Sequence, residues 1–208
     1  HDTLIFYKQI DYYKSGKKRS QGNYVNGIQD GTWIYFYESG KKEQEGNYKN
    51  NLPIGVWIWY YPNGQIKRKE NFNGSGKLEG VVEEYDSLGA EITRGEYYNG
   101  VQEGPWFYHV GDHKEVGTFT VGQFDGVWTH YYKNGKIAFI GSYDEGEPKG
   151  RHVYYHQNGI KKMEGKYLGG SKEGRWRTYD EMGEVTEEIT YKQGEIFKIN
   201  GFKVEKSQ

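Results

Sequence analysis

The sequence lacks cysteine altogether and has only two methionines and four prolines in 208 residues. The absence of cysteine excludes disulfides, thiolate catalysis and cysteine-ligated zinc, and it leaves the redox compartment open. No apolar run approaches the roughly 18 residues that a membrane-spanning helix needs. A formal net charge of −1 provides no overall attraction to nucleic acid or to an anionic membrane.

Aliphatic residues are also scarce, since the hydrophobic fraction is 34% and half of it is aromatic. A mean hydropathy of −1.01 is in the range where chains are often disordered. Disordered chains are poor in aromatic residues, however, and this one has 21 tyrosines, nine phenylalanines and six tryptophans. We therefore expect a chain that folds around a thin, ring-rich core.

Glycines recur every 22 to 25 residues and open seven units, at Gly31, Gly55, Gly80, Gly104, Gly126, Gly150 and Gly174. Tyr7 opens an eighth unit that lacks its first glycine. Two positions after each start (slot two) stand Gln9, Trp33, Trp57, Val82, Trp106, Trp128, His152 and Trp176. A ring also ends every unit, at Tyr24, Tyr48, Phe72, Tyr97, Phe119, Tyr143, Tyr167 and Tyr191.

Each unit reads as a β-hairpin, because strand-forming residues flank "PNGQ", "KNGK" and "QNGI". Asn-Gly between such residues is typical of a two-residue type I′ loop. Counting outward from Asn63-Gly64 places Trp57 opposite Glu70, and the same count places Trp128 opposite Gly141. Rings that face glycines in this way are predicted to lie across the opposite strand. Of the six histidines, His152 is predicted to replace tryptophan in slot two.

The unit at Gly104 is two residues short and has no Asn-Gly. With Gly111 and Asp112 as its loop, Trp106 faces Gly117 and Gly104 faces Phe119, as in the other units. The deletion then removes one residue from each arm and leaves every side chain on its face.

The predicted fold class is all-β, an elongated single twisted antiparallel sheet of about eight tandem β-hairpin repeats of about 24 residues. Sixteen strands at about 4.8 Å spacing would extend roughly 75 Å. The expected organisation is an N-terminal extension (1–6), eight repeats (7–197) and a C-terminal cap or tail (198–208), in which "FKINGFKV" forms a final strand or tight hairpin. The chain opens with His1 and not Met, which we read as favouring an exported protein, periplasmic or at the cell surface, over a cytoplasmic one.

Strand alternation separates the rings onto two faces. Slots two, four and six share one face, which we expect to be an aromatic and glycine spine. Slot five points the other way unless a bulge intervenes. It holds the candidate binding residues Tyr12, Phe36, Tyr60, Tyr85, Tyr131, Tyr155 and Tyr179.

The unit G-x-W-x-x-Y-Y-x-x-G-x(5)-G-x-Y, repeated over about residues 7 to 197, resembles the variant MORN repeat of bacterial proteins. Some proteins of that family are classed as YwqK-type antitoxins. The resemblance implies a non-enzymatic repeat scaffold that binds another protein. The better-known eukaryotic MORN repeat is similar but has a small residue where this chain has tryptophan.

No catalytic, cofactor-binding or metal-binding residues are expected. "GSGKLEG" (74–80) lacks the spacing of a phosphate-binding loop. His152 and His156 would lie about 13 Å apart on a strand, beyond the reach of one ion. His109 and His113 are nearer across their predicted turn, but a lone loop pair is seldom a site. Glu83-Glu84 and Glu187-Glu188 point to opposite faces, which excludes each as a glycosidase-like pair.

The predicted function is a scaffold whose partner is a protein, either a toxin, as the resemblance implies, or an envelope protein. A carbohydrate- or choline-binding module using the exposed ring row is one alternative. Contact with an anionic lipid surface or nucleic acid is another, through basic residues after the turns: Lys17, Lys18, Lys41, Lys42, Lys67, Arg68, Lys136, Lys161 and Lys162.

Overall fold

The computed structural model describes residues 4–204, and every regular element among them is a β-strand. The all-β prediction is therefore confirmed. No helix in this part of the chain has the length and apolar character needed to cross a membrane. The chain divides into two compact units, His1–Glu103 and Gly104–Gln208.

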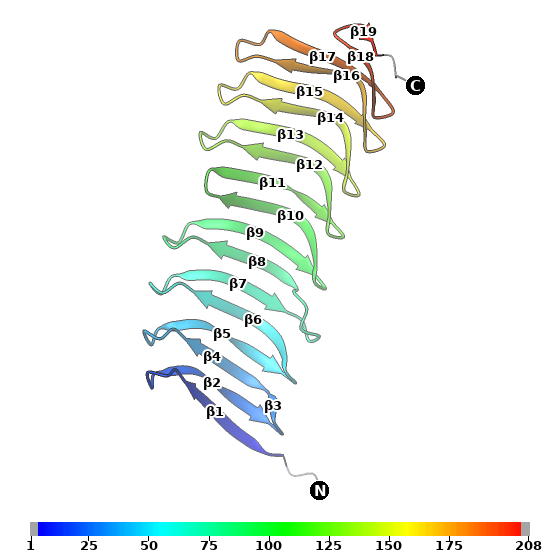
Figure 1. Cartoon of the computed structure of the whole chain (residues 1–208). Coiled ribbons are helices and arrows are strands. Elements are labelled where there is room, and N and C mark those ends of the chain that lie inside the picture. The colour runs from blue at the N-terminus through cyan, green and yellow to red at the C-terminus, as the bar shows by residue number, and fades with distance from the viewer. Residues whose placement is uncertain (1–3, 205–208) are drawn as a thin grey trace. The chain divides into compact units, whose positions relative to one another are not determined.

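The longer strands of the first unit follow one another in chain order, and each pairs antiparallel with the next long strand (Figure 1). Strand β2 pairs with both β3 and β4. The strands are β1 (Phe6–Tyr12), β2 (Lys18–Val25), β3 (Ile28–Gln29), β4 (Gly31–Phe36), β5 (Lys42–Lys49), β6 (Leu52–Tyr60), β7 (Ile66–Phe72), β8 (Gly80–Tyr85) and β9 (Glu91–Tyr98).

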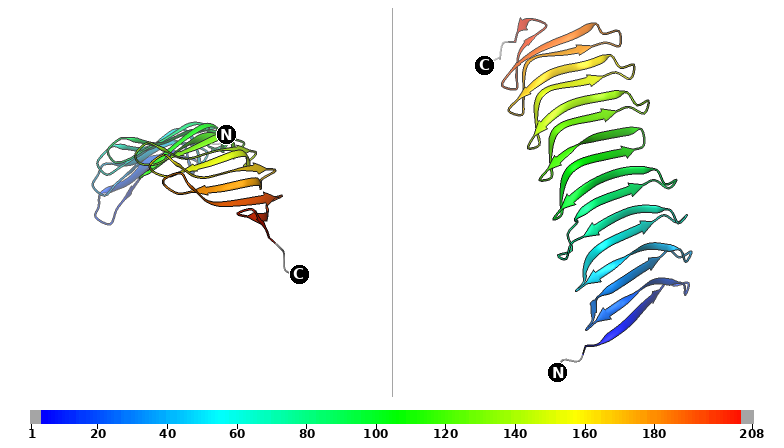
Figure 2. Two further views of the ribbon diagram at one scale, coloured as in Figure 1. Left: turned by 90° about the horizontal axis from the view of Figure 1, so that it is seen from above. Right: turned by 180° about the vertical axis from the view of Figure 1, so that it is seen from behind.

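The second unit repeats this antiparallel order. Its strands are β10 (Val101–Val110), which begins before the unit boundary, β11 (His113–Thr120), β12 (Gln123–Tyr131), β13 (Ile137–Asp144), β14 (Glu147–Tyr155), β15 (Lys161–Leu168), β16 (Ser171–Tyr179), β17 (Val185–Lys192), β18 (Glu195–Ile199) and β19 (Phe202–Lys203). The view from behind in Figure 2 shows no second layer on either unit within the described residues.

The predicted hairpin register is confirmed. Gly55 pairs with Phe72 and Trp57 with Glu70. The shortened unit also pairs as predicted, with Trp106 opposite Gly117 in an uninterrupted register out to the loop.

The shortened unit has the predicted two-residue loop, Gly111-Asp112, whereas the loops inside the other hairpins differ from the prediction of two-residue turns. The Tyr61 N–H donates to the Gln65 carbonyl at 2.8 Å, which leaves residues 62–64 as a three-residue loop. Within it, Gly64 alone has a positive φ, of 93°. A bulge beside Tyr60 absorbs the extra residue and restores the predicted register farther out.

Type I′ turns lie instead in the links between hairpins. Both central residues of these links have positive φ, as a type I′ turn requires. They are Asn26-Gly27, Asn50-Asn51, Asn99-Gly100, Val121-Gly122, Glu145-Gly146, Gly169-Gly170 and Gln193-Gly194.

The opening G-x-W of a unit, or Gly-Arg-His in the unit at Gly150, makes a second bulge against the preceding hairpin. In β6, residues 55–57 lie opposite the single residue Gly46 of β5, with a positive φ of 64° at Gly55. The Trp57 indole covers Gly46 so closely that a Cβ on that glycine would lie 2.1 Å from ring atom Cδ2. The indole N–H donates to the Asn47 carbonyl at 3.1 Å. The ring therefore fills the space that the bulge opens.

The prediction that a ring lies over its own register partner is consequently wrong. Trp128 pairs with Gly141, but its ring covers Gly117 of the preceding strand. Gly141 lies against Phe139 and His152. The same one-strand offset holds for Gly22–Trp33, Gly46–Trp57, Gly117–Trp128, Gly141–His152 and Gly165–Trp176.

The tryptophans of slot two form the core. Each is between 1% and 4% exposed, and neighbouring rings meet edge to face. His152 takes the tryptophan position, as predicted: it is 1% exposed, and its Nε2 lies 2.9 Å from the Ser142 carbonyl. Burial lowers the pKa of His152, and the hydrogen bond to Ser142 opposes that effect. We call this side of the strands the ring face.

In one repeat, both the ring and the glycine of this contact are replaced by other residues. Val82 replaces the tryptophan, and Glu70 replaces the glycine of the preceding strand. Both are buried, at 3% and 7% exposure. Glu70 forms an ion pair with Arg68, whose Nε also lies 3.3 Å from Glu84 Oε1. Burial raises the pKa of Glu70, and the positive charge of Arg68 opposes that effect.

At the C-terminal end, β18 pairs with β17, and β19 folds back on β18 through the type I′ pair Asn200-Gly201. These strands occupy the place where a cap is predicted, and their capping role stays a prediction. Residues 1–3 of the predicted N-terminal extension and 205–208 of the predicted tail lie outside the described residues.

Candidate binding face

The seven candidate residues of slot five lie on the side opposite the ring face, which we call the row face. Tyr12 is 59% exposed, and the other six are half-buried. A bulge between slots four and five precedes each of them. The extra residue belongs to the returning strand, so the side chains in slot five keep the predicted orientation.

Glutamate side chains accept hydrogen bonds from several of the slot-five tyrosines. The Tyr60 O–H donates to Glu45 at 2.5 Å, and the Tyr179 O–H donates to Glu164 at 2.7 Å. The Tyr85 O–H donates to Glu83 at 3.0 Å. Burial, together with the hydrogen bond to Glu45, raises the pKa of Tyr60 to about 12. These phenols are therefore neutral and fixed in orientation at physiological pH.

Lysine side chains lie over several ring faces of the row. The Nζ of Lys69 is 5.8 Å from the centre of the Tyr85 ring, and that of Lys114 is 5.4 Å from the Tyr131 ring. Lys18 lies similarly over Phe36, at 5.6 Å. Because such cation–π contacts occupy a ring face, they leave less of it for a sugar or a quaternary ammonium group.

The backbone carbonyls of the row join consecutive hairpins, a role that the sequence analysis missed. The ring in slot six of one hairpin reaches the slot-five carbonyl of the next. The tyrosine O–H donates in Tyr13–Phe36 (2.6 Å), Tyr37–Tyr60 (2.6 Å), Tyr61–Tyr85 (2.8 Å) and Tyr132–Tyr155 (2.5 Å). His156 Nε2 lies 2.9 Å from the Tyr179 carbonyl. The sequence signal for this link between hairpins was a tyrosine or histidine in slot six.

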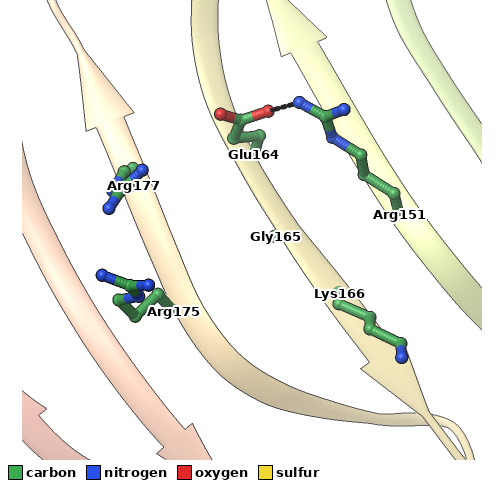
Figure 3. A pocket seen from close by; sticks show the side chains of 6 residues that line it. All are labelled: Arg151, Glu164, Gly165, Lys166, Arg175 and Arg177. Atoms are coloured by element: carbon green, nitrogen blue, oxygen red, sulfur yellow. Dashed lines mark hydrogen bonds and ion pairs between the residues drawn. The ribbon is translucent and has the colours of Figure 1, made fainter.

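A basic cleft of about 340 Å³ lies on the row face of the second unit. Its lining residues are Arg151 of β14, Glu164, Gly165 and Lys166 of β15, and Arg175 and Arg177 of β16 (Figure 3). Gly165 belongs to the lining through its backbone, because a side chain at this position would point to the ring face, where the Trp176 ring lies. Four cationic side chains and one carboxylate therefore surround a shallow opening.

The charges of the cleft are unevenly paired. Arg151 forms an ion pair with Glu164, and Arg177 donates to Glu188 at 2.8 Å. Burial would raise the pKa of Glu164, but hydrogen bonds from Arg151, Tyr179 and Lys161 outweigh it and lower that pKa to about 2. Within residues 4–204, no carboxylate forms an ion pair with Lys166 or Arg175. These two cations are available to an acidic ligand.

The basic residues after the turns do not gather into one surface. Lys42 pairs with Glu45 at 2.7 Å, and Lys161 pairs with Glu164 at 3.1 Å. Arg68 lies on the ring face, 6.0 Å from the centre of the Trp59 ring. Lys136 donates to the Asn158 carbonyl at 2.7 Å. Sequence reasoning did not single out Arg151, Lys166, Arg175 and Arg177, because their proximity depends on strand pairing across three strands.

Comparison with known proteins supports the repeat assignment. The family described as "MORN repeat variant" matches residues 8–26, 29–50, 53–73, 124–145 and 172–193. No curated protein matches the chain. Among solved structures, a chain in the crystal structure of TcdB2-TccC3-Cdc42 is similar, at 13% identity and a TM-score of 0.25. That match covers 91% of this chain and 13% of the other, so the chain spans a small part of the length of that relative.

The five matched segments have the period seen in the structure. Each spans the two strands and the turn of one hairpin: β1 and β2, β4 and β5, β6 and β7, β12 and β13, and β16 and β17. Together they make up just over half of the 208 residues. The chain therefore belongs to the MORN repeat variant family, a family of repeat scaffolds.

Proposed function

We propose that this protein is a non-enzymatic scaffold that binds another protein through its row face. The observation that carries the proposal is the basic cleft, where Lys166 and Arg175 flank Gly165 without a carboxylate partner in the described chain. An acidic extended segment of a partner would fit this opening, since arginine binds carboxylates well at interfaces. Tyr179, held by Glu164, lies at the side of the cleft.

The slot-five tyrosines of the second unit extend this surface. Tyr131, Tyr155 and Tyr179 belong to three successive hairpins, and each is half-buried. A partly buried tyrosine loses little conformational freedom when it is covered by a partner, which is why tyrosine is frequent at interfaces. Repeat scaffolds spread such contacts along a regular surface.

Two features favour a protein over the alternative ligands. The lysines over Phe36, Tyr85 and Tyr131 occupy ring faces that a sugar or choline group would need. The basic residues after the turns are divided between partners and faces, which weakens the case for a lipid surface. The family resemblance supplies a toxin as one partner to test, and an envelope protein is the other.

The test begins with a pull-down from the native organism, followed by calorimetry with the recovered protein and variants of this chain. Exchanging both cleft cations for glutamate (Lys166→Glu with Arg175→Glu) should weaken binding at least 100-fold, because repulsion replaces attraction. Lys136→Glu, beside an exposed turn, controls for the reversal of one charge outside the cleft and should change the affinity less than threefold.

A second variant tests the tyrosines of the row. Replacing Tyr131, Tyr155 and Tyr179 together by phenylalanine keeps the rings and removes the hydroxyls, whereas replacement by serine removes the rings as well. We expect the serine triple variant to lose binding and the phenylalanine triple variant to keep most of it. Unchanged binding by both the cleft variant and the serine triple variant would refute the proposal. If the chain binds to a glycan array and to no protein, it is a carbohydrate-binding module instead.

A further inference from the structure

Three potential metal ligands gather on the ring face of the second unit. His113 and Glu115 lie two residues apart on β11, and His130 lies opposite Glu115 on β12. Their nitrogen and oxygen ligand atoms all lie within 4.8 Å of one another. His113 Nε2 is in contact with the Glu115 carboxylate, and His130 Nε2 lies 4.0 Å from Glu115 Oε2.

The short hairpin explains why these groups meet. Its two-residue loop is followed by a register without a bulge, from Val110 opposite His113 to Gly104 opposite Phe119. His113 therefore has the same orientation as Glu115, directly after the loop. The other hairpins have a bulge at this point, which interrupts the alternation.

His130 also departs from the repeat. It occupies slot four, where most other units have a ring without a metal-binding nitrogen, such as Tyr35, Trp59, Tyr108 and Tyr154. The His113 and His130 rings are 5.4 Å apart and nearly perpendicular, at 78°. Two imidazoles thus stand on either side of one carboxylate.

We propose that His113, Glu115 and His130 bind a transition-metal dication, with Zn²⁺ as the first choice. Two imidazole nitrogens and one carboxylate oxygen form a ligand set that suits zinc, with metal–ligand distances of about 2.0–2.2 Å. Such distances place tetrahedral ligand atoms roughly 3.3 Å apart. The 4.0 Å between His130 Nε2 and Glu115 Oε2 is longer than this spacing, so these two side chains have to rotate towards each other when the ion binds.

The three ligands belong to two neighbouring hairpins, His113 and Glu115 to one and His130 to the next. Because the ligands come from β11 and β12, a bound ion would clip the shortened hairpin to the next one.

Three protein ligands leave a coordination position for water or another molecule. Beside the cluster is a cleft of about 330 Å³, lined by Tyr108, His113, Glu115, Phe119, Phe124 and Trp128. This cleft belongs to the ring face, so the metal site is separate from the proposed protein-binding face. The zinc experiment can therefore fail without bearing on the proposed protein-binding function, and the reverse also holds.

Titration of the full chain with ZnCl₂, followed by calorimetry, tests the proposal. We expect one ion per chain with a Kd of about 10 μM or tighter, and a thermal midpoint that rises with zinc concentration. His113→Gln and His130→Gln should each weaken zinc binding at least tenfold. Two matched controls, His109→Gln on the preceding strand and His1→Gln at the chain end, should leave the affinity within twofold of the unmodified protein.

His113→Gln is the safer variant for folding, because the His113 side chain is 54% exposed. Circular dichroism without metal should be the same for this variant and for the unmodified protein. A chain that binds no zinc at 1 mM, or a His113→Gln variant that binds as tightly as the unmodified chain, would overturn the assignment. Loss of binding in the His1 control would place the ion at the chain end instead.

Discussion

The indole of Trp57 covers Gly46, one strand back and eleven residues earlier, and does not cover Glu70, which it faces across its own hairpin. The ring and the glycine belong to different hairpins. The main core contact of each repeat is therefore a contact with its predecessor, as expected of repeat proteins that are stabilised by nearest neighbours.

Substitution of a covered glycine should be costly. The space at Gly46 is filled by the Trp57 ring, so we expect Gly46→Ala to lower the free energy of unfolding by about 2–3 kcal/mol. Gly74→Ala is the matched control, because a Cβ there meets nothing within 4 Å and Gly74 has no positive φ. Urea denaturation measures both, and equal stability of the two variants would contradict the ring placement.

A strained turn offers a stabilising change. Val121 is the first central residue of a type I′ link, with a φ of 50°, and it is 74% exposed. The left-handed region is unfavourable for a β-branched residue, and asparagine occupies the equivalent position at Asn26, Asn50 and Asn99. We expect Val121→Asn to raise the free energy of unfolding by about 1 kcal/mol.

The comparison for that variant is Val127→Asn on β12, where the valine is 55% exposed within a strand. Asparagine is unfavourable in strands, so this change should leave stability unchanged or reduce it. Thermal unfolding distinguishes the two outcomes. A Val121→Asn variant that melts below the unmodified chain would show that the turn does not strain the valine.

The sequence allowed the hairpins, their register and the two faces to be predicted, because these depend on local periodicity. It did not reveal the bulge at slot five, since Asn-Gly suits either a two-residue loop or a longer one that ends in glycine. Nor did it reveal that Trp128 covers Gly117 and not Gly141, because both glycines lie one strand away from the ring. The bulge at the G-x-W start of the unit determines which of the two glycines the ring covers.

Candidate sites were harder to predict than the fold. The orientation of the slot-five residues followed from alternation, whereas the basic cleft and the histidine pair needed pairing between hairpins. Sequence spacing suggested His109 as the neighbour of His113, but His109 pairs with Lys114, and His113 lies beside His130 of the next hairpin. Contacts across a link between hairpins were not considered in the sequence-based reasoning.

Acid should remove the stabilisation that the ionised Glu164 side chain contributes on the row face. Hydrogen bonds from Arg151, Tyr179 and Lys161 hold the pKa of Glu164 at about 2, against an ordinary value of 4.5. The resulting stabilisation is fully present above pH 4.5 and is lost as the pH falls towards 2. We expect Glu164→Gln to lower the free energy of unfolding by about 1 kcal/mol at pH 7 and by almost nothing near pH 2. Glu181→Gln, in an exposed turn, controls for the loss of one charge, and a pH-independent effect at Glu164 would count against the ion pairs.

Removal of the last two strands should expose a sheet edge. Strand β18 pairs with β17, and the Asn200 N–H donates to the Glu188 carbonyl at 2.7 Å. Deletion of residues 195–208 leaves the β17 backbone groups unpaired, and such edges promote association. We expect dimers or larger species by light scattering after size-exclusion chromatography, and a chain shortened only by residues 205–208 to behave as the full chain does. A truncated chain that matches the full chain in mass distribution and stability would refute the cap.

Glu70 and Val82 test whether the ring-on-glycine contact can be restored where the chain lacks it. Val82→Trp alone would force an indole against Glu70, and we expect a loss of about 2–3 kcal/mol of stability. Glu70→Gly alone would leave space beside Val82 and remove one partner of Arg68, at a cost of about 1–2 kcal/mol. With both changes the indole gains a glycine to cover, as Trp57 covers Gly46. The double variant should therefore be more stable than the sum of the single effects by at least 1 kcal/mol in a double-mutant cycle. A cycle of Val82→Trp with Gly74→Ala should show no coupling, and strict additivity between positions 70 and 82 would mean that the two departures from the repeat are independent.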